Sequence, residues 1–166
     1  MSDSDKAVAV CLGTILTDEP WRDFGFSRRP VYGAFFQRFR SKWRVKLEQT
    51  VLQQMFCALI AGYVVSGKAS KESIDVSLVK YMSARGVATT AFGFSSQEEC
   101  VRCLKSSIEE FVSSPPRQWS SVLSAHIRPD LLPDKKLAAL IRLGCIQFGD
   151  IASSLILRLR NGADEV

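Results

Sequence analysis

The chain lacks long apolar runs and has no obvious export signal. No run of apolar residues approaches the ~20 that a helix needs to cross a membrane, so we expect no transmembrane segment. The first residues are acidic where a secretory signal is basic, and the Asn-x-Ser/Thr acceptor of N-glycosylation is absent. We therefore expect an intracellular protein, cytoplasmic or nuclear.

Histidine is nearly absent too, which narrows the possible catalytic chemistry. His126 is the only one, so any Ser–His or Cys–His pair would depend on it. No Gly-x-Ser-x-Gly elbow is present, and no convergent set of acid, base and nucleophile is visible. We predict that the protein is not an enzyme and has no catalytic residues, and that His126 forms a bridging contact near a helix end.

The five cysteines do not form a disulfide pattern, because their number is odd and their spacing is irregular. Cys100 and Cys103 form a C-x-x-C pair that would be half a zinc site if joined by His126 and Cys145. On a helix, however, both share a face with Leu104, which favours small apolar residues of the core. We therefore predict reduced thiols, no metal and no cofactor.

The segment from Gly62 to Lys68 has the G-x4-G-K spacing of a phosphate-binding loop. The next position holds Ala69 where Mg²⁺ binding needs a hydroxyl, and the preceding residues have helical periodicity. The segment therefore predicts a glycine-marked break between two helices, the second capped by Ser70.

The apolar spacing is helical along most of the chain, and 166 residues with 46% apolar content suit one globular domain. The predicted helices cover 5–16, 30–67, 70–85, 95–112, 116–127 and 134–143, and the last of these either continues or restarts near Asp150 and runs to Arg160. Ser95 and Glu98 have the spacing of a capping box at the start of the fourth. We predict an all-α fold, a single-domain bundle of about six to eight helices spanning 1–166, with flexible ends at 1–4 and 161–166.

The strongest helix signal begins at Pro30. Phe35, Phe39, Trp43 and Leu47 recur at four-residue steps, which predicts one long amphipathic helix as the main scaffold.

The same helix carries the positive charge. The formal net charge is +5, and the segment 27–47 holds seven basic residues and no acidic one. Such a concentrated field attracts anionic partners. The candidate nucleic-acid-binding residues are Arg28, Arg29, Arg38, Arg40, Lys42, Trp43, Arg44 and Lys46.

Three interpretations of this segment stay open. The basic rows contact the phosphates of nucleic acid, with RNA favoured. They lie on an anionic membrane or an acidic protein. Or they are the solvated rim of an aromatic row that belongs to the core. Trp43 is a base-stacking candidate only if it is exposed.

The C-terminal stretch from Leu137 to Leu159 is apolar on more than one face, which predicts burial in the bundle centre or in a subunit interface. This hydrophobic layout has a faint likeness to the central helix of the apoptosis regulators that bind a partner helix in a groove. Their Asn-Trp-Gly-Arg signature is absent, and too few residues follow for the further helices that such proteins have, so we infer no membership of that family. The first functional hypothesis is a regulatory or structural protein that binds nucleic acid. The alternative is a helical adaptor that binds a protein partner. It either holds a partner helix in an apolar groove, as those regulators do, or self-associates as a homo-oligomer.

Overall fold

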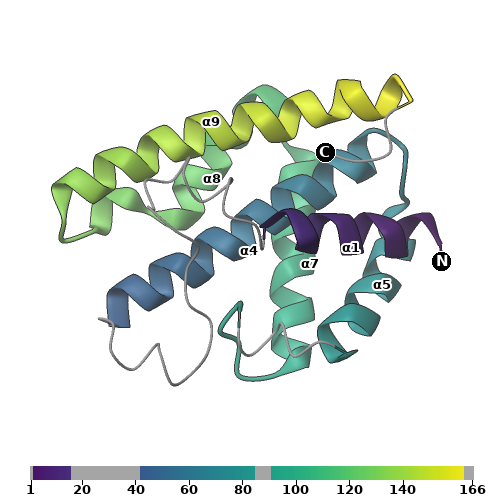
Figure 1. Ribbon diagram of the computed structural model, residues 1–166, viewed down its shortest axis with the longest axis horizontal. Coiled ribbons are helices and arrows are strands. Elements are labelled where there is room, and N and C mark those ends of the chain that lie inside the picture. The colour runs from purple at the N-terminus through teal and green to yellow at the C-terminus, as the bar shows by residue number, and fades with distance from the viewer. Residues whose placement is uncertain (1, 16–41, 85–90, 163–166) are drawn as a thin grey trace.

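The computed structural model describes residues 2–15, 42–84 and 91–162. Within these ranges the chain forms six α-helices and no strand, which confirms the predicted all-α fold class. The helices are α1 (Asp3–Ile15), α4 (Lys42–Val65), α5 (Lys71–Ala84), α7 (Gln97–Ser113), α8 (Trp119–Ile127) and α9 (Lys135–Arg160) (Figure 1). Two short 3-10 helices, Pro116–Gln118 and Pro129–Leu131, precede α8 and α9.

The central helix of the bundle is α4. It contacts α1, α7, α8 and α9 and crosses the middle of the molecule in Figure 1. Every residue from Gln54 to Tyr63 is buried, so this part of the helix is covered on all sides. The predicted end of the long helix before Gly67 is confirmed, because α4 ends at Val65. Its predicted start at Pro30 lies outside the described residues.

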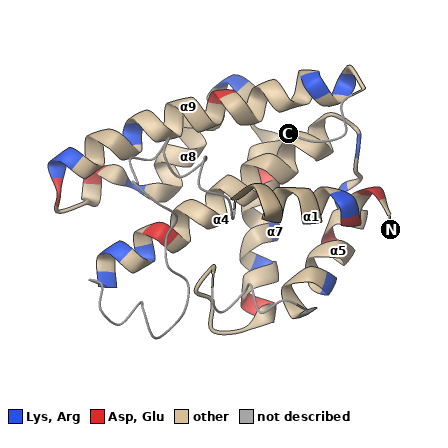
Figure 2. Cartoon of the chain, viewed as in Figure 1, with Lys and Arg blue, Asp and Glu red and all other residues tan. Residues whose placement is uncertain are grey.

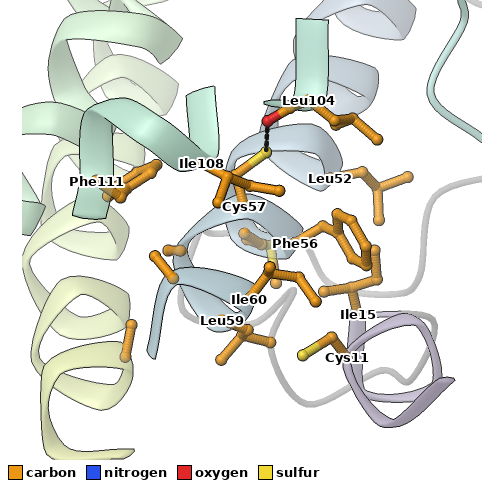
Figure 3. Packing of buried hydrophobic residues seen from close by; sticks show 14 of the residues in the cluster. Cys11, Ile15, Leu52, Phe56, Cys57, Leu59, Ile60, Leu104, Ile108 and Phe111 are labelled. Carbon is orange, nitrogen blue, oxygen red and sulfur yellow. Dashed lines mark hydrogen bonds between the residues drawn. The ribbon is translucent and has the colours of Figure 1, made fainter. Parts of the chain in front are cut away.

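The core is built around α4 by large apolar side chains from several helices. Phe56 and Ile60 of α4 lie near Ile15 of α1, and Ile108 of α7 belongs to the same buried cluster and lies near Cys57 of α4 (Figure 3). The Cys57 thiol donates a hydrogen bond to the Leu104 carbonyl at 3.8 Å. Burial of each large apolar side chain contributes roughly 1.5–3 kcal/mol, so this cluster is the main source of stability.

The turn between α4 and α5 is the predicted glycine-marked break. Gly67 has a φ of +83°, the left-handed conformation that ends many helices. Lys68 N–H donates to the Tyr63 carbonyl at 3.1 Å, which satisfies a carbonyl of the last turn. The Ser70 hydroxyl then accepts from Ser73 N–H at 3.2 Å, so the predicted cap of α5 is confirmed.

The cap of α7 lies one residue later than predicted. Ser96, not Ser95, is the N-cap, and its hydroxyl accepts from Glu99 N–H at 3.2 Å. Ser95 donates instead to the Glu99 carboxylate. Both 95–98 and 96–99 match the Ser-x-x-Glu pattern, and only the backbone path into the helix selects between them.

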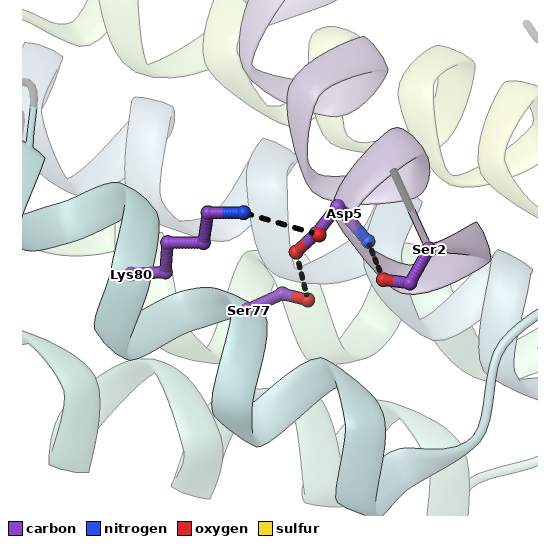
Figure 4. Close-up of polar contacts among 4 residues, drawn as sticks. All are labelled: Ser2, Asp5, Ser77 and Lys80. Atoms are coloured by element: carbon purple, nitrogen blue, oxygen red, sulfur yellow. Dashed lines mark hydrogen bonds and ion pairs between the residues drawn. The ribbon is translucent and has the colours of Figure 1, made fainter.

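One face of α1 docks on α5 through a polar contact (Figure 4). The Asp5 carboxylate accepts from the Ser77 hydroxyl at 2.7 Å and from the Lys80 ammonium at 3.3 Å. The hydrogen bond from Ser77 is the main cause that lowers the pKa of Asp5 below its ordinary value. Ser2 caps the helix by accepting from Asp5 N–H at 3.1 Å, so ordered contacts begin inside the 1–4 segment.

The long α9 lies along one edge of the molecule and packs on α8 and α4 (Figure 1). Asp134 caps its start by accepting from Leu137 N–H at 3.0 Å, and the helix continues without a break to Arg160. Among the described residues, α9 is the one helix long and apolar enough to cross a membrane, and less than half of its most apolar stretch is buried. The helices of the described ranges therefore bury only part of its apolar surface.

Candidate functional site

The basic amino-terminal end of α4 carries the described part of the predicted binding segment (Figure 2). Lys42 and Lys46 are exposed, and Trp43 is 38% exposed. Leu47, the next residue of the same apolar row one helical turn later, is buried. At Trp43 the row therefore belongs to the surface, which meets the condition for base stacking.

Arg44 is in a different environment from its basic neighbours. It is half-buried, and its guanidinium Nε lies 3.7 Å from a carboxylate oxygen of Glu48, whose side chain is almost fully buried. The Glu48 carboxylate therefore offsets part of the Arg44 charge. The spacing of four residues between them is the sequence signal of such a pair. The other four predicted residues, Arg28, Arg29, Arg38 and Arg40, lie outside the described residues.

A groove of about 670 Å³ runs between α5 and α7. Its lining includes Val79 and Val101 but is mostly polar or charged, as with Arg102. Two ion pairs join the same helices: Lys71 to Glu109 at 3.1 Å and Lys105 to Asp75 at 3.8 Å.

His126 forms the bridging contact that the sequence predicts. Its Nε2 lies 2.6 Å from a carboxylate oxygen of Glu110, which joins the end of α8 to α7. Both side chains are partly exposed, so the pair contributes little to stability.

The cysteines are free, and four of the five are buried. Burial raises the pKa of Cys100 and Cys145 to about 12 and that of Cys57 well above its ordinary value, so these thiols stay protonated. The core position predicted for Cys100 is confirmed, whereas Cys103 is only half-buried because it lies at the edge of the buried face of α7. In the described ranges, no group of three or more Cys, His, Asp or Glu side chains is arranged to hold a metal ion.

The outer face of α9 is a second surface feature. Five large apolar side chains on it are exposed: Leu140, Leu143, Ile146, Ile151 and Leu157. The sequence predicted apolar residues on more than one face of this helix, and within the described residues these five are left exposed. The comparisons with known proteins gave no match: no family model, no curated protein and no solved structure is similar to this chain.

Proposed function

We propose that the protein binds nucleic acid, with RNA favoured, through the basic segment that ends in the first turns of α4. The observation that supports this proposal is the exposure of Trp43 beside a row of two exposed lysines, Lys42 and Lys46, which lie one helical turn apart on α4. An exposed aromatic ring beside cations suits a strand whose base stacks on the ring while its phosphates contact the ammonium groups. Single-stranded loops of RNA offer such unstacked bases, which favours RNA over duplex DNA.

The roles of the individual residues follow from their surroundings. Lys42 and Lys46 are phosphate contacts, and Trp43 is the stacking residue. Arg28, Arg29, Arg38 and Arg40 supply further positive charge from the preceding segment. Arg44 contributes least, because Glu48 lies beside it.

The test is fluorescence anisotropy with labelled single-stranded and duplex RNA and DNA at about 50 and about 200 mM salt. We expect micromolar or tighter binding to single-stranded RNA that weakens by at least about tenfold across this range, because several phosphates are neutralised. Absence of binding at the lower salt would contradict the proposal.

Charge reversal locates the surface. Lys42→Glu with Lys46→Glu should reduce the affinity by more than about tenfold. A matched control is Arg102→Glu with Arg117→Glu, which changes the net charge equally at exposed positions on α7 and before α8. An equal loss in both double variants would mean that the net charge, and not the end of α4, determines binding. Arg44 is left unchanged, because a glutamate there would repel Glu48 and disturb the fold.

Trp43→Ala separates stacking from charge. Stacking on an aromatic ring contributes about 1–3 kcal/mol per base, so the affinity for single strands should fall by about tenfold while the salt dependence is unchanged. Unaltered affinity would remove Trp43 from the site.

A further inference from the structure

The outer face of α9 is an apolar surface that no described part of the chain covers. Leu157 is 63% exposed, Ile146 54% and Leu143 49%, whereas the opposite side of the helix packs on α8 and α4. Together with Leu140 and Ile151 they extend from residue 140 to residue 157, about 26 Å along the helix at 1.5 Å per residue. Apolar side chains scattered singly are normal on a surface, but a row along one helix indicates a contact.

The charges around this row are almost all positive. Both ends of the helix are basic, with a pair of lysines at the start and a pair of arginines at the end (Figure 2), and Arg142 is exposed. The basic residues of α9 are Lys135, Lys136, Arg142, Arg158 and Arg160. Asp150 is the single acidic residue in the helix, and it lies on the exposed side.

A second copy of the chain does not complement this face. If two α9 helices paired along their outer faces, basic ends would meet in either orientation, because the first turn and the last turn both carry two cations. Like charges in register oppose association. The complementary surface is therefore anionic and apolar at once.

We propose that the outer face of α9 binds the surface of an anionic lipid bilayer. The helix lies flat in the interface, with Leu143, Ile146 and Leu157 inserted below the headgroups and the basic side chains at their phosphates. The long stems of Lys and Arg let the charges stay at headgroup level while the leucines insert. The helix lies on the membrane and does not cross it, because its other face, including Phe148 and Leu155, packs in the bundle.

Asp150 is the residue on this face that opposes lipid binding. Its carboxylate would lie close to lipid phosphates and be partly desolvated, and both effects are unfavourable. Neutralising it therefore strengthens binding, which gives a variant that gains the function instead of losing it.

The face shares no residue with the basic end of α4, so this proposal does not rest on nucleic-acid binding. The test is sedimentation of the purified full chain with vesicles of phosphatidylcholine alone or mixed with phosphatidylserine. We expect at least about tenfold stronger binding to the mixed vesicles, weakened by added salt. Absence of binding to the mixed vesicles, or equal binding to both kinds, would overturn the proposal.

Variants assign the binding to α9. Ile146→Gln with Leu157→Gln should lower vesicle binding by at least about tenfold. The matched control, Val76→Gln with Val79→Gln, removes two exposed apolar residues from α5 and should leave binding unchanged. Asp150→Asn should increase binding by about threefold or more. Equal loss in the α5 variant, or unchanged binding in the α9 variant, would contradict the assignment.

Two further results would identify a different occupant. A concentration-dependent dimer, lost in the Ile146→Gln, Leu157→Gln variant, would show that a second copy covers the face. Capture of an acidic amphipathic peptide by the wild type without any vesicle binding would show that the occupant is a protein helix. Either result overturns the membrane proposal.

Discussion

The two longest described helices, α4 and α9, are both rich in apolar residues, but the bundle covers them differently. α4 is surrounded by four helices, and ten consecutive residues from Gln54 to Tyr63 are buried. α9 lies at the edge and buries one face, with large apolar side chains exposed on the other. The comparison shows that an apolar pattern on several faces is satisfied within the fold in α4, and only partly in α9. Five of the nine exposed large apolar side chains in the described residues therefore lie on α9.

The strongest way to break the packing of α9 is to empty its inner face. Phe148 is 2% exposed and belongs to the core cluster. Phe148→Ala should lower the free energy of unfolding by about 3–5 kcal/mol, because apolar burial is lost and a cavity remains. Denaturant unfolding followed by circular dichroism measures this change. A loss below about 1 kcal/mol would show that the inner face of α9 is not part of the core.

The contact of α9 with α8 depends on a glycine. A Cβ added at Gly149 would lie 2.8 Å from the backbone N and Cα of Ser120, so the two helices would have to separate. We expect Gly149→Ala to cost about 1–3 kcal/mol in the same unfolding measurement.

The matched substitution is Gly62→Ala in α4. There the added Cβ meets the end of the Leu155 side chain at 3.1 Å, which can shift, and alanine favours the helix by up to about 1 kcal/mol. Gly62→Ala should therefore cost less than Gly149→Ala. The reverse order would mean that the α4–α9 contact is the tighter one.

The polar contact that joins α1 to α5 should weaken in acid. Asp5 accepts hydrogen bonds from Ser77 and Lys80, and these contacts lower the pKa of Asp5 in the folded protein below its ordinary value. The stabilisation is therefore fully present above about pH 4 and is lost as the pH falls through the lowered folded pKa. Urea midpoints of the wild type and of Asp5→Asn should differ at pH 7 and converge in acid.

Asp3→Asn, at an exposed residue in the same turn, is the control for the removal of a charge. If both variants showed the same pH dependence, the loss of a negative charge near the chain end would explain the effect, and the Ser77 contact would not.

The sequence predicted what depends on local spacing and missed what depends on packing between distant segments. Helix positions, the Gly67 break and the Ser70 cap follow from patterns within a few residues, whereas the partner of His126, Glu110, lies on another helix and was not predicted. The position of α4 in the centre and of α9 at the edge does not, because both have apolar residues on more than one face. Only the neighbours decide which helix is surrounded.

The candidate site shows the same limit. The basic segment was visible as a run of charge, but the exposure of Trp43 depends on how far the bundle covers α4. The pairing of Arg44 with Glu48 is available from their spacing of four residues, but Glu48 lies one residue beyond the basic segment 27–47 that defines the predicted site. Cys103 lies at the edge of its helix face, where a helical wheel does not separate buried from half-buried positions.

The substitution with the smallest expected effect, on the outer face of α9, tests most directly whether the two faces of this helix differ in their contribution to stability. Leu143 on the outer face of α9 is 49% exposed. Leu143→Gln should lower the free energy of unfolding by no more than about 1 kcal/mol, because about half of the side chain is already in water in the folded state and only the buried half is lost. Set beside the loss in Phe148→Ala, this result would show that one helix carries a face that stabilises the fold and a face that does not. A loss above about 1 kcal/mol would mean that another part of the chain covers the outer face in solution, and the surface assigned to lipid would then belong to the fold.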